Sequence, residues 1–264
     1  MKKFVDLEAL NLRSAPDMSP ETRIAILHLG QPVDVLSPAP EPGWIKVKAT
    51  VGGVAKTGVV KAEINGQQSL RNPVSPQREA LVAQAIVEWL RFEKGQGQEH
   101  HAPYFKYIGE MWQAIGLNLD GRDRDQFWSA AAISFMVRNA GNTVPKYKKF
   151  KFAAAHARYM HDAIIRREKN DTKAPFWGFR LHEVKPEIGD IACKWRESPR
   201  DFDDAANSDA FKSHTDIIVS VQPDFVLAIG GNVGQSVNIT RYAKTGAGFL
   251  APQDQVFMHM VNRT

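Results

Sequence analysis

The segment FWSAAAISFMVRNAG carries a hydroxyl group at the start of a predicted helix. Ser129 is followed by the small residues 130–132, which allow other backbone to approach closely. We expect a helix over about residues 127–140, with Asp125 as its cap and Gly141 as its end. A nucleophile in this first turn would lie among free N–H groups, which favour developing negative charge and can form part of an oxyanion site. The alternative is a small first-turn residue without a chemical role.

A candidate base lies in the segment KSHTDIIVSVQPDFVLAIGGN. His214 and Asp216 are two residues apart in a predicted strand, so their side chains point to the same face, while Thr215 points to the other. A hairpin would bring Asn232 back beside His214, where its side chain could orient the imidazole. The two glycines before Asn232 permit unusual backbone angles. The alternative is an edge-strand histidine next to a solvated aspartate.

Other polar groups give weaker signals. The lone cysteine, Cys193, lies in a predicted strand, and we expect a buried, inert thiol. His156 and His161 are five residues apart and so lie on different faces of a helix, which does not suit a metal site. The pattern around His100 and His101 adds no convincing ligand set. We expect no metal and no cofactor.

A basic cluster precedes the third predicted helix. It interleaves lysines with aromatic residues: Lys146, Tyr147, Lys148, Lys149, Phe150 and Lys151. This pattern is compatible with nucleic-acid binding. A solvated loop or a contact with an anionic wall polymer is the favoured interpretation, so nucleic acid is not an expected partner.

The elements that would position these groups divide the chain in two. Residues 1–65 contain short β-branched runs separated by Gly and Pro residues, Pro40 among them, and predict a small barrel. Residues 66–74 are polar and rich in turn residues, and predict a linker. Residues 75–264 predict helices over 76–94, 127–140 and 152–167, then strands over 188–195, 214–221, 225–229, 233–241 and 255–261. Helices followed by antiparallel strands indicate an α+β fold.

Composition limits the class of protein. The chain has 264 residues, of which 43% are hydrophobic and 24% charged, as in globular proteins. One cysteine excludes an intramolecular disulfide framework, and no apolar run is long enough for a membrane helix. The net charge of +5 favours anionic partners without choosing among them. The start MKKFVDLEAL lacks the apolar stretch of a secretory signal, which leaves localisation open.

FWSAAAISFMVRNAG, SHTDIIVSV and AIGGN resemble stretches of bacterial papain-like cell-wall hydrolases of the NlpC and CHAP types. FWSAAAISFMVR, AAHARYM and HTDIIV with IGGNVGQSV are more closely similar to the domain of unknown function 2272, over about residues 75–264. The resemblance implies a papain-like domain with N-terminal helices packed on an antiparallel sheet. It implies Ser129 as nucleophile, His214 as base and Asn232 as orienting residue, with Asp216 as the competing orienting residue.

His156 and Trp128 are further candidate residues, and the chain departs from the papain-type pattern at Ser129. His156, in AAHARYM, matches a family position of undefined role; support of the site is the preferred interpretation, and substrate contact is the alternative. Trp128, beside Ser129, is another candidate for substrate contact. Papain-type relatives use cysteine where this chain has Ser129. A true serine hydrolase, a member without catalysis and a replaced nucleophile all remain open.

The first unit resembles a different family. ALNLRSAP, HLGQPVDVL, GWIKVKA and KTGVVKAEI are similar in order to the bacterial SH3-type domain, over residues 3–64. The resemblance implies a small all-β barrel that binds peptidoglycan or positions a catalytic neighbour. A protein-interaction barrel without wall affinity is the alternative. Trp44 is a candidate binding aromatic, although an aromatic residue at a strand start is more often part of a core.

The sequence therefore predicts a peptidoglycan hydrolase, an amidase or an endopeptidase, targeted by its first domain. Peptidoglycan is the expected partner, together with a possible inhibitor or immunity protein. A wall enzyme without a leader fits an injected effector toxin or a phage lysin. The alternative is a non-catalytic wall-binding or protein-binding module with a degenerate papain-like site.

Overall fold

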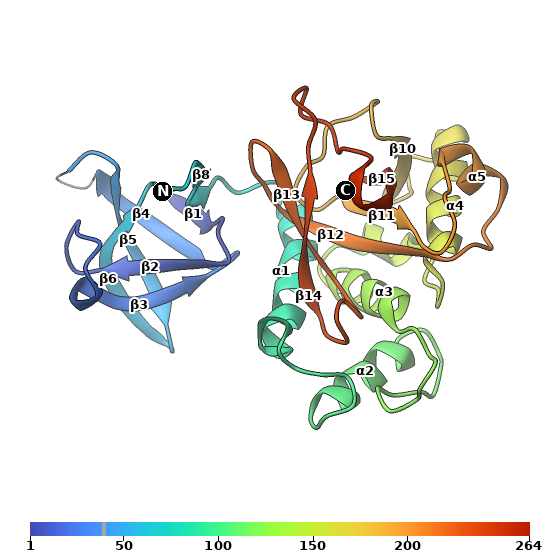
Figure 1. Cartoon of the computed structure of the whole chain (residues 1–264), viewed down its shortest axis with the longest axis horizontal. Coiled ribbons are helices and arrows are strands. Elements are labelled where there is room, and N and C mark those ends of the chain that lie inside the picture. The colour runs from blue at the N-terminus through green and yellow to red at the C-terminus, as the bar shows by residue number, and fades with distance from the viewer. Residues whose placement is uncertain (39–40) are drawn as a thin grey trace. The chain divides into compact units, whose positions relative to one another are not determined.

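The computed structural model describes residues 1–38 and 41–264; the predicted turn residue Pro40 lies outside them. The chain divides into two compact units, residues 1–75 and 76–264. The first is built from strands, and the second combines helices with a sheet (Figure 1). The predicted α+β class with antiparallel sheets is confirmed.

One curved sheet forms most of the first unit. Its strand order is β3-β2-β6-β5-β4-β1-β9, and every paired strand is antiparallel, so that the sheet curls into a half-barrel. A short 3-10 helix, η1 (Pro20–Thr22), precedes β3, and β7 pairs with β8 outside the sheet. The strands are β1 (Lys2–Val5), β2 (Ala9–Arg13), β3 (Arg23–His28), β4 (Pro32–Pro38), β5 (Trp44–Val51), β6 (Val54–Lys61), β7 (Glu63–Ile64), β8 (Gln67–Gln68) and β9 (Leu70–Arg71).

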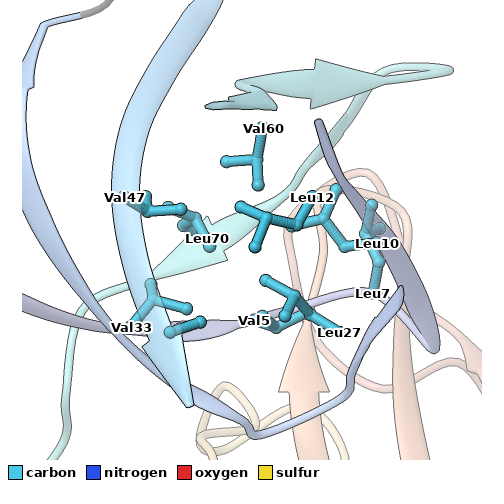
Figure 2. Close-up of a cluster of buried hydrophobic side chains, with 10 residues drawn as sticks. Val5, Leu7, Leu10, Leu12, Leu27, Val33, Val47, Val60 and Leu70 are labelled. Atoms are coloured by element: carbon cyan, nitrogen blue, oxygen red, sulfur yellow. The ribbon is translucent and has the colours of Figure 1, made fainter. Parts of the chain in front are cut away.

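The concave side of this sheet holds an aliphatic core. Alternate residues of the strands point inward, because side chains alternate along a strand, and Figure 2 shows them meeting. The buried members are Val5, Leu7, Leu10, Leu12, Leu27, Val33, Val47, Ala49, Val60 and Leu70.

The segment 66–74, predicted as a linker, belongs in part to this unit. It contains β9, in which Leu70 pairs with Val5 and is buried in the core. The turn residues around Leu70 conceal a strand of only two residues, which is too short to show alternation. The unit therefore extends to residue 75.

The second unit packs helices on a six-stranded antiparallel sheet of order β10-β15-β11-β12-β13-β14. Helices α1 and α3 contact β12 and β13, and α4 contacts β10 and β12. The helices are α1 (Pro76–Arg91), α2 (Tyr104–Gln113), α3 (Ser129–Ala140), α4 (His156–Glu168) and α5 (Phe202–Asn207), with short 3-10 turns η2 (Glu93–Gly95), η3 (Pro145–Lys149) and η4 (Gln253–Gln255). The strands are β10 (Phe176–Arg180), β11 (Ile191–Trp195), β12 (Ser213–Val221), β13 (Phe225–Gly230), β14 (Asn238–Ala243) and β15 (Val256–Asn262). Within the described residues, no helix is both long and apolar enough to cross a bilayer.

A buried polar network holds α1 to the sheet. The Arg78 guanidinium donates to the carbonyl of Ile188 at 2.8 Å, to Asp190 Oδ1 at 2.9 Å and to the carbonyl of Asn262 at 2.7 Å. The Asn262 side chain in turn donates to Tyr147 Oη at 2.7 Å. These bonds fix the start of β11, and β11 pairs with β12, the strand that carries His214.

Candidate active site

Ser129 is the first residue of α3 and is only 7% exposed. Trp128, the residue before the helix, is anchored. Its ring is buried and stacks on Phe92 with centroids 5.8 Å apart, and its Nε1 donates to Glu99 Oε2 at 2.6 Å. Trp128 is thus part of the core and does not offer its ring to a substrate, unlike the prediction. The N-cap position of α3 is held by Trp128, and not by Asp125 as predicted.

The imidazole next to Ser129 is that of His156. Ser129 Oγ lies 2.6 Å from His156 Nε2. His156 is the first residue of α4, and its Nδ1 contacts Thr215 Oγ1 at 2.9 Å and the hydroxyl of Tyr159. The two hydroxyls also bond each other at 2.8 Å. A neutral ring with its proton on Nδ1 satisfies these contacts and leaves Nε2 free to accept from Ser129.

The surroundings of His156 favour this neutral ring. Burial, with further contributions from the charges of His214 and Arg196, holds the pKa of His156 well below its usual value. Burial also raises the pKa of Tyr159 well above its usual value, although the hydrogen bond with Thr215 opposes this. At neutral pH the site therefore holds an uncharged imidazole, with the Ser129 hydroxyl on one side and the hydroxyls of Thr215 and Tyr159 on the other.

His214 makes a separate pair with Asp216. Its Nε2 lies 2.8 Å from Asp216 Oδ1, and the hydroxyl of Tyr242 donates to Asp216 Oδ2. Burial would raise the pKa of Asp216, but the charge of His214 and the hydrogen bonds from His214 and Tyr242 outweigh it, so the pKa is lowered and the carboxylate is ionised. The rings of His214 and His156 are adjacent, with centroids 5.1 Å apart.

This geometry differs from the predicted pairing of Ser129 with His214. His156 occupies the position next to the hydroxyl, and Thr215 of β12 contacts its other ring nitrogen. Asp216 is the partner of His214, as its shared face suggested. Asn232 lines the same pocket as Ser129 and His156, but in the described part of the chain its side chain bonds neither imidazole.

The two glycines before Asn232 serve close packing. Their φ angles are not positive, unlike that of Asn232, which is 56°. A Cβ on Gly230 would lie 1.6 Å from Asp216 Oδ1, and one on Gly231 would lie 2.3 Å from the Cβ of Ala132. Glycine is therefore required at these two positions because Asp216 on one side and α3 on the other approach the backbone.

A pocket of about 500 Å³ opens onto Ser129 and His156. It is lined by aromatic, amide and charged side chains around the two candidate catalytic groups. The lining residues are Phe127, Ser129, Ala154, Ala155, His156, Arg196, Glu197, Phe211, Lys212, Ser213, Asn232 and Gln255.

The remaining candidates are not among the residues that line this pocket. Trp44 is a buried residue of the first unit, with Lys61 Nζ 5.1 Å from its ring centroid. Cys193 is buried, and burial raises the pKa of its thiol well above the usual value, so it is not a reactive group. In the basic cluster, Tyr147 and Phe150 point into the core and cannot stack on bases. Among the described residues, no group of His, Cys, Asp and Glu side chains could hold a metal ion.

Sequence reasoning missed the hydroxyl groups that hold His156. Tyr159 is three residues after His156, a spacing that places both on one helix face, and this is the signal that could have found it. Thr215 carries no such signal, because its contact with His156 joins segments 59 residues apart. Tyr242 meets Asp216 only through the pairing of β12, β13 and β14.

Comparison with known proteins concerns the second unit. No curated protein matches the chain. A family model matches residues 95–262, which is more than half of the chain and includes Ser129, His156, His214 and Asn232. The predicted similarity to the domain of unknown function 2272 is thereby confirmed, and the chain belongs to the family described as an uncharacterized protein conserved in bacteria (DUF2272).

Proposed function

We propose that this protein is a peptidoglycan hydrolase in which Ser129 attacks an amide carbonyl. The observation that carries the proposal is the 2.6 Å contact of Ser129 Oγ with the Nε2 of His156, at a helix start that faces a pocket. A serine hydroxyl becomes a useful nucleophile only when an adjacent base takes its proton. His156 meets that requirement, because its Nε2 is an acceptor and its Nδ1 is held by two hydroxyls.

The reaction follows the usual course of acyl transfer. Ser129 Oγ bonds to the carbonyl carbon while its proton passes to His156 Nε2, which then gives the proton to the leaving amine. Water, deprotonated by the same nitrogen, releases the acyl group from Ser129. The free N–H groups of the first turn of α3 can stabilise the oxyanion. The His214 ring lies against the ring of His156, and Asp216 holds His214 through its Nε2.

Chain order supports a papain-like second unit. A nucleophile on helix α3 is followed by a histidine on strand β12 and a polar residue, Asn232, after the next strand. The site differs from the papain-like order in one respect: the histidine next to Ser129 comes from helix α4. We propose in addition that the first unit is an SH3-type barrel that binds the wall. Either amidase or endopeptidase activity fits this site.

The test is release of soluble muropeptides from purified sacculi, followed by mass spectrometry. The Ser129→Ala variant should release none while still binding sacculi. Asn139→Ala, at the far end of α3, is the matched control and should act like the wild type. Equal release by Ser129→Ala and wild type would refute the nucleophile assignment.

The alternative is a non-catalytic wall-binding module. The serine itself favours it, because papain-type relatives use a thiol, which is far more nucleophilic at neutral pH than a hydroxyl. Binding to sacculi without any product, over a range of pH on both sides of neutrality, would establish this alternative.

A further inference from the structure

The charged side chains that line the pocket carry one more positive charge than negative charge. Three line it, namely Arg196, Glu197 and Lys212. Glu197 Oε1 accepts a hydrogen bond from Lys212 Nζ at 2.6 Å, so these two charges compensate each other. For the Arg196 guanidinium, residues 1–38 and 41–264 provide neither an acceptor nor an ion-pair partner. One uncompensated positive charge therefore remains beside Ser129 and His156.

The backbone of Arg196 is held in place. Arg196 follows β11, and its N–H donates to the carbonyl of Lys212 at 2.9 Å, directly before β12. This bond continues the ladder in which Trp195 pairs with Ser213. The same strand β12 supplies Thr215, the partner of His156. Arg196 is thus attached to the element that orients the base, and its charge acts on His156.

The neutral groups of the pocket suit a peptide. Asn232 and Gln255 contribute carboxamides, which can both donate to and accept from peptide groups. Phe127, which is 71% exposed, and Phe211 contribute aromatic surface at the pocket. An exposed phenylalanine next to a nucleophile is consistent with contact to the apolar part of a ligand.

We propose that Arg196 is a specificity-determining residue that binds a carboxylate of the substrate. The substrate class is then an acidic peptide. A guanidinium presents two parallel N–H groups that match the two oxygens of a carboxylate. Because the pocket holds only about 500 Å³, the carboxylate lies close along the chain to the carbonyl that Ser129 attacks. This inference rests on the proposed function, since it places the carboxylate relative to the bond that is cut.

The probe is a pair of preparations: soluble muropeptides, and the same muropeptides with their carboxyl groups converted to amides. Binding is measured by calorimetry with the full chain carrying Ser129→Ala, so that turnover does not interfere. We expect the carboxylate form to bind more tightly. Adding Arg196→Gln should weaken that binding roughly tenfold or more and remove the preference, since a charge-assisted pair is lost. Arg200→Gln is the matched control, because Arg200 is an exposed arginine of the same segment that does not line the pocket, and it should keep the preference.

Two results would overturn the subsite: a carboxylate preference that survives Arg196→Gln, or no binding of the carboxylate form at all. The measurements distinguish failure of the Arg196 subsite from failure of the hydrolase proposal. Carboxylate-dependent binding through Arg196 without any cleavage by the wild type would keep the subsite and refute the hydrolase. Cleavage of both preparations with the same KM, unchanged by Arg196→Gln, would keep the hydrolase and refute the subsite.

Discussion

Two imidazoles lie near the Ser129 hydroxyl, and they differ in what their ring nitrogens can do. His156 Nε2 lies 2.6 Å from Ser129 Oγ, whereas His214 Nε2 is bonded to Asp216 Oδ1 at 2.8 Å. A general base needs an acceptor nitrogen within hydrogen-bond reach of the proton that it removes. Under the proposed function, this criterion makes His156 the base and His214 the residue that positions it.

Replacing each histidine separately distinguishes these roles. His156→Gln should lower kcat on muropeptides by a factor of about 10²–10⁴, the usual contribution of a general base. His214→Gln should lower kcat less, because Ser129 keeps its acceptor. The rates are measured on variants whose melting temperature shows that they are folded. Wild-type turnover by His156→Gln, with none by His214→Gln, would return the role of base to His214.

The pH dependence follows from the same residue. A base works in its deprotonated form, so activity is lost as the pH falls through the pKa of His156. Burial first, then the charges of His214 and Arg196, lower that pKa well below 6.5. The acid limb of kcat/KM should therefore lie below pH 6.5, and Arg196→Gln should move it to higher pH by removing a positive charge. A limb at or above pH 6.5 in the wild type would contradict this assignment.

At the level of the elements, β12 and β13 bring the buried carboxylate of Asp216 close to the backbone of Gly230. Asp216 Oδ1 occupies the space where a side chain at Gly230 would begin. Hydrogen bonds from His214 and Tyr242 hold Asp216 there, so it cannot move aside without leaving a buried charge unpaired.

Gly230→Ala should therefore destabilise the second unit. Its Cβ would lie 1.6 Å from Asp216 Oδ1, and overpacking of this kind costs about 1–3 kcal/mol of unfolding free energy. The measurement is urea unfolding at pH 7, together with turnover, which should also fall. Gly246→Ala is the control, because nothing lies within 4 Å of its Cβ position. Equal unfolding free energies for the two variants would show that the packing around Asp216 adapts.

Periodicity predicted the elements that have long, clear patterns. The first helix begins at Pro76, as predicted, and β11, β12, β13 and β15 lie within three residues of the predicted strands, whereas β14 begins at Asn238, five residues after the predicted start. Helix α2 was missed although Ile108, Met111 and Trp112 have helical spacing and are buried, because its pattern covers only ten residues. Strand β10 was missed because it is defined by its pairing with β15, about 80 residues later.

The titratable members of the candidate site were predictable, and so was the pairing of His214 with Asp216, but the pairing of Ser129 with His156 was not. Local patterns and family resemblance indicated Ser129, His156, His214, Asp216 and Asn232. Which imidazole reaches Ser129 depends on how α4 packs on β12, and no local pattern encodes that contact. The charge pattern around the pocket could not be predicted from the sequence either, because Arg196 and Lys212 come together only when β11 and β12 pair.

For the whole molecule, the relevant fact is that each unit has a core of its own. Among the described residues, the buried members of the aliphatic cluster of the first unit lie within residues 5–70, and the second unit has a cluster around Ile218 and Tyr242. Under the proposed function, the first unit acts by keeping the second near the wall, which raises the local concentration of enzyme without changing the chemical step.

Residues 76–264 expressed alone should therefore separate binding from catalysis. We expect kcat and KM on soluble muropeptides to match those of the full chain, because the pocket lies wholly in this unit. On intact sacculi at low enzyme concentration the rate should fall roughly tenfold or more, and the deficit should shrink as enzyme concentration rises, as mass action requires for a lost tether. A pelleting assay with residues 1–75 should show binding to sacculi. Equal rates on sacculi for the full chain and residues 76–264 at every enzyme concentration would show that the first unit does not tether the enzyme to peptidoglycan.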